Sequence, residues 1–199
     1  TAAIWISGVL GKNPQAANQI ALNLSSMTFM FGMGLGVAAM IRVGNQKGLK
    51  NFADLRRIAL SIFFLTLLLE VVFAIFFLLG RHWFPKIYLD VNDPMNQADN
   101  LEVILLASQL LLVAAFFQRS DGLQVVILGA LRGLQDVKVP TLITLIAYWL
   151  IGFPICYYLG LHTELKSTGI WIGLLSGLTA SAIMLYIRFN KMTKRLIRT

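Results

Sequence analysis

The sequence predicts an all-α bundle of membrane-spanning helices, and three observations lead to this fold class. The chain of 199 residues is 57% hydrophobic and only 13% charged, whereas soluble domains are about 45–50% apolar and about 25% charged. It contains five apolar runs that are long enough to cross a bilayer, which takes roughly 20 residues. Its Lys and Arg residues are frequent in every second connection between these runs and sparse in the others, as in multi-pass membrane proteins.

The composition also excludes several classes of function. The net charge of +8 does not indicate a nucleic-acid binder, because such a protein needs a basic patch on a folded soluble face and these charges lie between apolar runs. A single cysteine, Cys156, allows neither an internal disulfide nor a cysteine zinc site. The histidines His82 and His162 lie far apart, and the sequence contains no P-loop, G-x-S-x-G or H-E-x-x-H motif. We therefore expect no enzyme, no cofactor and no resident metal centre.

Each expected helix corresponds to one apolar run. Residues 1–10 are apolar but too short to span, and we expect them to be the end of a helix that begins upstream of the chain. The five full spans are residues 16–41, 58–79, 103–131, 141–161 and 169–189. In the first span, closely spaced glycines favour tight helix packing. In the fourth, Pro154 predicts a kink because proline removes a backbone hydrogen bond.

The distribution of positive charge predicts the orientation. Most Lys and Arg residues lie in the segments 42–57, 132–140 and 188–199, which five antiparallel spans bring to the same side. Short cytoplasmic loops are enriched in Lys and Arg. We expect a multi-pass protein of the plasma (inner) membrane, surrounded by lipid, with its C-terminus in the cytoplasm.

Three charged residues lie inside the expected spans: Glu70, Arg119 and Asp121. A charge at mid-membrane costs at least about 2.5–3.5 kcal/mol and usually has a function. Gln118, Asp121 and Gln124 form a polar stripe at i, i+3 and i+6 of one helix, which has to face protein or a water-filled cavity. A carboxylate there can bind a cation or a proton; the alternative is an aspartate that only joins helices through hydrogen bonds.

Other polar residues lead to further expectations. Phe117 lies one turn from Asp121 and is a candidate to line the same cavity. Gln19 and Asn23 share a helix face at i, i+4 and are also candidates, although hydrogen bonding between helices is an equal alternative. Glu70 and Arg119 lie on antiparallel helices at depths that differ by roughly 5 Å. This depth match predicts a structural ion pair, the alternative being that each residue finds other partners.

Two stretches of the chain resemble a known family. AANQIALNLSSMTFMFGMGLGVAAMIRVGNQKG (residues 16–48) resembles the eighth helix and following loop of the multidrug and toxic compound extrusion (MATE) transporters. DGLQVVILGALRGLQDVKVPTLITLIAYWLIGFPICYYLG (residues 121–160) resembles their tenth and eleventh helices. The strings A-x-Q-I-A-x-N, R-V-G-N and G-A-L-R-G-x-x-D carry the likeness in combination. It extends over essentially residues 1–199, as the C-terminal six-helix lobe with its first helix truncated.

The resemblance implies a fold and a function. The family has twelve helices in two six-helix lobes and exports cationic, often aromatic, compounds in exchange for Na⁺ or H⁺. An acidic residue of helix ten belongs to its cation site, and Asp121 has that position. Some relatives have a tyrosine ligand one turn earlier where this chain has Phe117. A glutamate on helix seven would lie before Thr1.

We thus expect a cation-coupled antiporter lobe for drugs and organic cations, which works with an N-terminal lobe of the same protein. Two alternatives remain: a lipid-linked precursor flippase of the same superfamily, which would need a more basic cavity, and a membrane scaffold subunit that transports nothing.

Overall fold

The computed structural model describes residues 11–89 and 97–198. Five helical segments are long and apolar enough to cross a membrane: α2 (Lys12–Gly48), α3 (Phe52–Gly80), α5 (Gln97–Gly133), the series α6 (Lys138–Ile146), η1 (Ala147–Gly152) and α7 (Phe153–Leu161), and α8 (Lys166–Arg198). A short helix, α4 (Phe84–Tyr88), lies between α3 and α5. The described part of the chain contains no strand, which confirms the all-α class. The expected partial helix of residues 1–10 lies outside the described residues.

The helices are longer than the expected spans, because apolar runs measure the thickness of the hydrocarbon layer while helices continue beyond it. The expected basic connection 42–57 is therefore mostly helical, since α2 continues to Gly48 and α3 begins at Phe52. Lys, Arg and Gln are good helix formers. The side chain of Asn51 accepts a hydrogen bond from the backbone N–H of Asp54 and caps α3.

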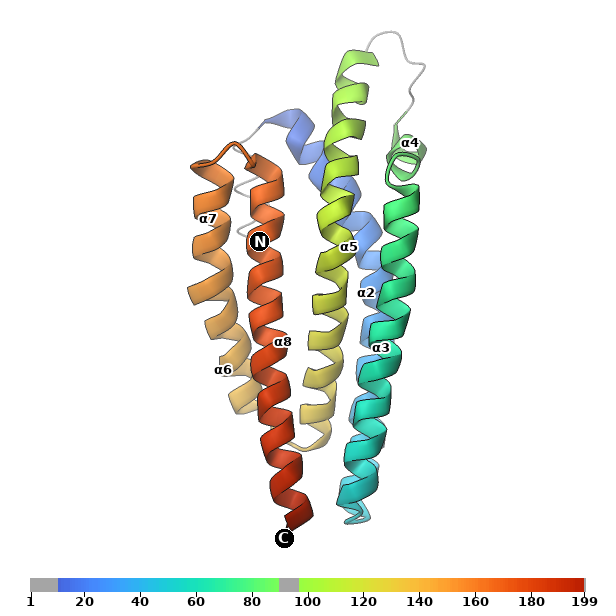
Figure 1. Ribbon diagram of the computed structural model, residues 1–199, viewed down its shortest axis with the longest axis vertical. Coiled ribbons are helices and arrows are strands. Elements are labelled where there is room, and N and C mark those ends of the chain that lie inside the picture. The colour runs from blue at the N-terminus through green and yellow to red at the C-terminus, as the bar shows by residue number, and fades with distance from the viewer. Residues whose placement is uncertain (1–10, 90–96, 199) are drawn as a thin grey trace.

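The long helices run along the length of the molecule, and the basic segments lie at one end (Figure 1). The α2–α3 connection, the α5–α6 connection and the C-terminal end of α8 are all found there, and we call this the basic end. Helix α5 packs against α2, α3 and α8. Residues of α5 are thus in contact with most of the bundle.

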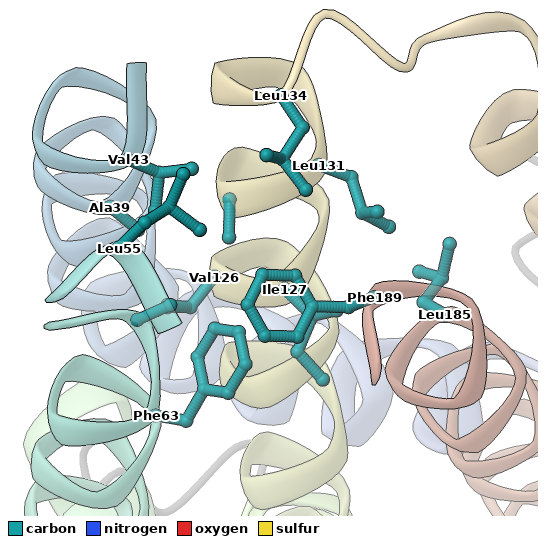
Figure 2. Packing of buried hydrophobic residues seen from close by; sticks show 12 residues of the cluster. Ala39, Val43, Leu55, Phe63, Val126, Ile127, Leu131, Leu134, Leu185 and Phe189 are labelled. Atoms are coloured by element: carbon teal, nitrogen blue, oxygen red, sulfur yellow. The ribbon is translucent and has the colours of Figure 1, made fainter. Parts of the chain in front are cut away.

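Two apolar clusters are arranged along α5. The basic-end cluster joins α2, α3, α5 and α8 (Figure 2) and consists of Ala39, Val43, Leu55, Ala59, Phe63, Val126, Ile127, Ala130, Leu131, Leu134, Leu185 and Phe189. The outer cluster consists of Ala17, Ile20, Ala21, Phe77, Val103, Ala107, Leu110, Leu111, Ala114, Ala115 and Trp171. On α5, the outer cluster ends at Ala115 and the basic-end cluster begins at Val126. Between them, α5 carries Gln118, Asp121 and Gln124, and we call the part of the bundle around these three side chains the polar layer.

Small residues set the distance between α2 and α5. A Cβ atom at Gly129 would collide with the backbone oxygen of Gly36, and one at Gly133 would meet the backbone of Met40. Glycines of α5 therefore allow the closest approach of the two helices. On α2, Gly32 and Gly36 also lie against α5, as the sequence predicts, whereas Gly34 has no neighbouring atom within 4 Å of an added Cβ.

The fourth span changes its winding in the middle. Residues 147–152 form the π-helical segment η1, and α7 begins directly after it, with Pro154 in its first turn. Proline cannot donate a hydrogen bond to the preceding turn and clashes with its carbonyl group, and π-helical turns accommodate such a disturbance. On the neighbouring helix, Gly177 lies against Gly152, so α8 packs tightly on the irregular turn.

Candidate cation site

The polar layer is built around three side chains of α5. Gln118 and Gln124 are buried, with 3% and 5% of their surface exposed, and Asp121 between them is partly buried. Their spacing of three residues places them along one side of the helix. The structure therefore places the predicted stripe inside the bundle, between the two apolar clusters.

Each glutamine of the stripe connects α5 to a different neighbour. The Nε2 of Gln118 donates to the backbone oxygen of Glu70 on α3 at 3.4 Å. The hydroxyl of Tyr148, on η1, donates to the Oε1 of Gln124 at 2.7 Å. The stripe thus reaches from α3 on one side to the π-helical turn on the other.

Asp121 lies between these two connections. The carboxylate of Glu70 lies against the backbone of Gly122, the residue after Asp121. Two carboxylates that face one low-dielectric region repel each other. A bound cation would relieve that repulsion.

The carboxylate of Glu70 lies where three helices meet. It takes the space that a Cβ atom at Gly122 of α5 would need, and a Cβ atom at Gly32 of α2 would lie 3.8 Å from its Oε1. The side chain is 1% exposed. Glycine at position 122 is therefore what allows a carboxylate of α3 to lie against the backbone next to Asp121.

Arg119 does not form the predicted pair with Glu70. Its guanidinium lies over the ring of Phe116, 5.1 Å from the centroid, and borders a cavity of about 310 Å³ between α3, α5 and α8. Within residues 11–89 and 97–198, the ion pair that forms is Arg188 with Asp136. Gln118, the neighbour of Arg119 on α5, reaches the backbone oxygen of Glu70 instead. One residue rotates the helix face by about 100°, which turns Arg119 away.

Phe117 is part of the apolar packing. Its ring makes an edge-to-face contact with Trp171 of α8, with centroids 5.2 Å apart, and it packs against the outer cluster. The indole Nε1 of Trp171 donates to the Oδ1 of Asn18 at 2.8 Å. Phe117 therefore supports the layer from the outer side.

Gln19 and Asn23 lie on an exposed side of α2 and bond to each other at 3.4 Å. Neighbouring residues of α2, Ala17 and Ile20, belong to the outer cluster that packs on α5. Within the described part of the chain, no hydrogen bond joins the pair to the stripe of Asp121.

Tyr148 is the member of the layer that sequence reasoning missed, because its position fitted either interfacial or core packing. One signal was available: Gln124 and Tyr148 are equally distant in sequence from Asp136, in the connection that reverses the chain. Residues placed in this way reach similar depths on two antiparallel helices.

The comparisons with known proteins agree with this architecture. The family model described as MatE matches residues 1–158. The chain belongs to the MatE family. Relatives include a probable multidrug resistance protein NorM of Rhodopseudomonas palustris, 40% identical over 90% of this chain, and the multidrug resistance protein MdtK of Proteus mirabilis, 44% identical over 90% of it.

Solved structures of MatE proteins have the same fold. The eukaryotic MATE transporter AtDTX14 superposes with a TM-score of 0.82 at 21% identity, over 97% of this chain and 43% of that one. An outward-facing multidrug resistance MATE transporter gives 0.83 at 17% identity, over 100% of this chain and 42% of the neighbour. The relatives named as multidrug resistance proteins are likewise covered over only 37% and 38% of their length. Members of the MatE family are transporters and not enzymes, and the chain spans about two fifths of the length of these relatives and neighbours.

Proposed function

We propose that this chain is the C-terminal lobe of a membrane exporter that moves organic cations and drugs out of the cell in exchange for Na⁺ or H⁺. The observation that carries the proposal is the polar layer, in which Asp121 lies inside the bundle between two apolar clusters. Membership of the MatE family and relatives named as multidrug resistance proteins support it. Asp121 is the residue that binds the coupling cation.

The proposed mechanism follows from charge. A carboxylate in a low-dielectric layer binds a cation strongly, and a cationic drug and the coupling ion compete for that charge or affect each other through bending of the helices around it. The membrane potential contributes about 2.3 kcal/mol per charge per 100 mV. The π-helical turn η1 is joined to the layer by the hydrogen bond from Tyr148 to Gln124, one helical turn from Asp121, so a movement of α5 at Asp121 can be passed to the irregular part of the fourth span through Gln124.

The environment of the lobe is also part of the proposal. Large apolar side chains are exposed along α3 and α7, among them Phe64 and Tyr158, and they suit lipid or an N-terminal lobe. The basic end faces the cytoplasm of a cell whose plasma (inner) membrane the helices cross. The flippase alternative would need a basic layer, whereas the one here contains two acids and Arg119 faces elsewhere.

The replacement Asp121→Asn in the full-length transporter tests the proposal. Asparagine keeps the size of the side chain but cannot carry the charge, so we expect drug efflux from cells to fall by about tenfold or more, with folded yield unchanged. The matched control is Asp99→Asn, at the exposed start of α5, which should export normally. Undiminished efflux by the Asp121 variant would refute the assignment and favour a scaffold.

A further inference from the structure

Glu70 is a buried carboxylate for which the proposed exporter mechanism has no role. Its Oε2 has no hydrogen-bond partner among residues 11–89 and 97–198, and the side chain is 1% exposed. The ion pair formed within those residues involves other side chains. A buried carboxylate without a partner costs several kcal/mol. Its position therefore favours a positively charged ligand.

A second buried oxygen next to Glu70 lacks a partner as well. The Oε1 of Gln118 has no hydrogen bond among the described residues, although the side chain is 97% buried and its Nε2 reaches the backbone of Glu70. While Glu70 is ionised, both free atoms are acceptors, so neither can satisfy the other. Burying such groups is costly unless a donor or cation fills the site.

These oxygens are close to Asp121. Gln118 lies one turn before it on the same side of α5, and the carboxylate of Glu70 lies against Gly122, the next residue along the chain. Helices α3 and α5 thus bring oxygen atoms to the region around Asp121, and the absence of a side chain at Gly122 provides the space for the Glu70 carboxylate.

We propose that Glu70 is a second carboxylate of the cation site, and that Glu70, the amide oxygen of Gln118 and Asp121 together bind one monovalent metal ion of the Na⁺ type. The inference rests on the proposed function and deepens it. A proton on Glu70 provides one O–H donor, which can satisfy one further acceptor oxygen, whereas a metal ion binds several oxygens at once. Carboxylate and carbonyl oxygens are the ligands of hard cations.

Binding of radioactive Na⁺ to the purified full-length transporter in detergent tests this proposal. We expect saturable binding to the wild type, no binding to Asp121→Asn, and an affinity about tenfold lower for Glu70→Gln, which removes one charged ligand at constant size. Glu164→Gln, in the exposed link between α7 and α8, is the matched control and should bind like the wild type. Gel filtration checks that each variant is folded.

A second substitution covers the case in which Glu70→Gln does not fold. Glu70→Asp keeps the charge but withdraws the carboxylate by one methylene, and we expect Na⁺ affinity to fall by roughly threefold or more. The proposal is overturned if the folded Glu70 variants bind Na⁺ within twofold of the wild type, or if the wild type binds no Na⁺. Efflux by Asp121→Asn is measured separately. If this variant loses efflux but the wild type binds no Na⁺, the shared Na⁺ site is refuted, while the proposed exporter function remains possible with H⁺ as the coupling ion.

Discussion

The polar layer and the basic-end cluster are both buried along α5, yet they differ in how completely their atoms are satisfied. In the basic-end cluster, apolar side chains of four helices pack against one another, and Phe189 is 0% exposed. In the polar layer, buried oxygens of Glu70 and Gln118 have no partner among the described residues. Complete packing stabilises a fold, while unpaired polar atoms cost stability unless a ligand satisfies them.

This difference assigns separate roles to the two regions. Substitutions in the basic-end cluster should lower the free energy of unfolding and leave cation affinity unchanged in the protein that folds. Substitutions of Glu70 and Asp121 in the polar layer should lower cation affinity and leave the free energy of unfolding nearly unchanged. The two regions do not have separate roles if substitutions in either of them lower the free energy of unfolding and the cation affinity together.

The largest effect on stability is expected for Phe189→Ala. Its ring makes an edge-to-face contact with Phe63 at 5.2 Å, in the centre of the basic-end cluster. Truncation leaves a cavity, so we expect a loss of about 3–5 kcal/mol in the free energy of unfolding, measured by denaturation in detergent. Phe64→Ala is the control, because Phe64 is 68% exposed on the same helix as Phe63, and it should cost less than about 0.5 kcal/mol. Equal costs for both substitutions would contradict the packing described here.

A smaller loss is expected for Gly129→Ala, which tests the close approach of α2 and α5. The added methyl group would overlap the backbone oxygen of Gly36, so the helices have to separate, at a cost of about 1–3 kcal/mol. The thermal midpoint of the purified protein measures this loss. Gly34→Ala on α2 is the control, since no atom lies within 4 Å of the added methyl group. Alanine at this position should leave the thermal midpoint unchanged or raise it. An unchanged thermal midpoint for Gly129→Ala would show that α2 and α5 can accept the methyl group without separating.

The sequence was sufficient for those features that depend on local composition. Apolar runs predict the spans, Lys and Arg distribution predicts which connections share an end, and the spacing of Gln118, Asp121 and Gln124 predicts one polar side of α5. Helix ends were less predictable, because a helix continues past the membrane as long as its residues favour it. Asn51 fixes one such end through its cap.

Contacts between helices could not be predicted in the same way. Glu70 and Arg119 match in depth, but the face that α5 turns toward α3 depends on packing of the whole bundle, and it presents Gln118. The small volume of Gly122 then decides where the Glu70 carboxylate lies. The π-helical turn likewise depends on Pro154 together with the close packing of Gly152 on α8.

The smallest effect is expected for Tyr148→Phe, at the edge of the polar layer next to η1, where Tyr148 and Gln124 form a side-chain hydrogen bond between helices. The substitution removes the hydroxyl that donates to Gln124 at 2.7 Å and keeps the ring. A typical hydrogen bond contributes about 0.5–1.5 kcal/mol, so we expect a loss of about 1 kcal/mol in the free energy of unfolding and a weaker effect on Na⁺ affinity than Glu70→Gln causes. Tyr158→Phe, on an exposed ring of α7, should change neither quantity. A larger loss of affinity for Tyr148→Phe than for Glu70→Gln would place the ion on the η1 side of Asp121 and not between Asp121 and α3.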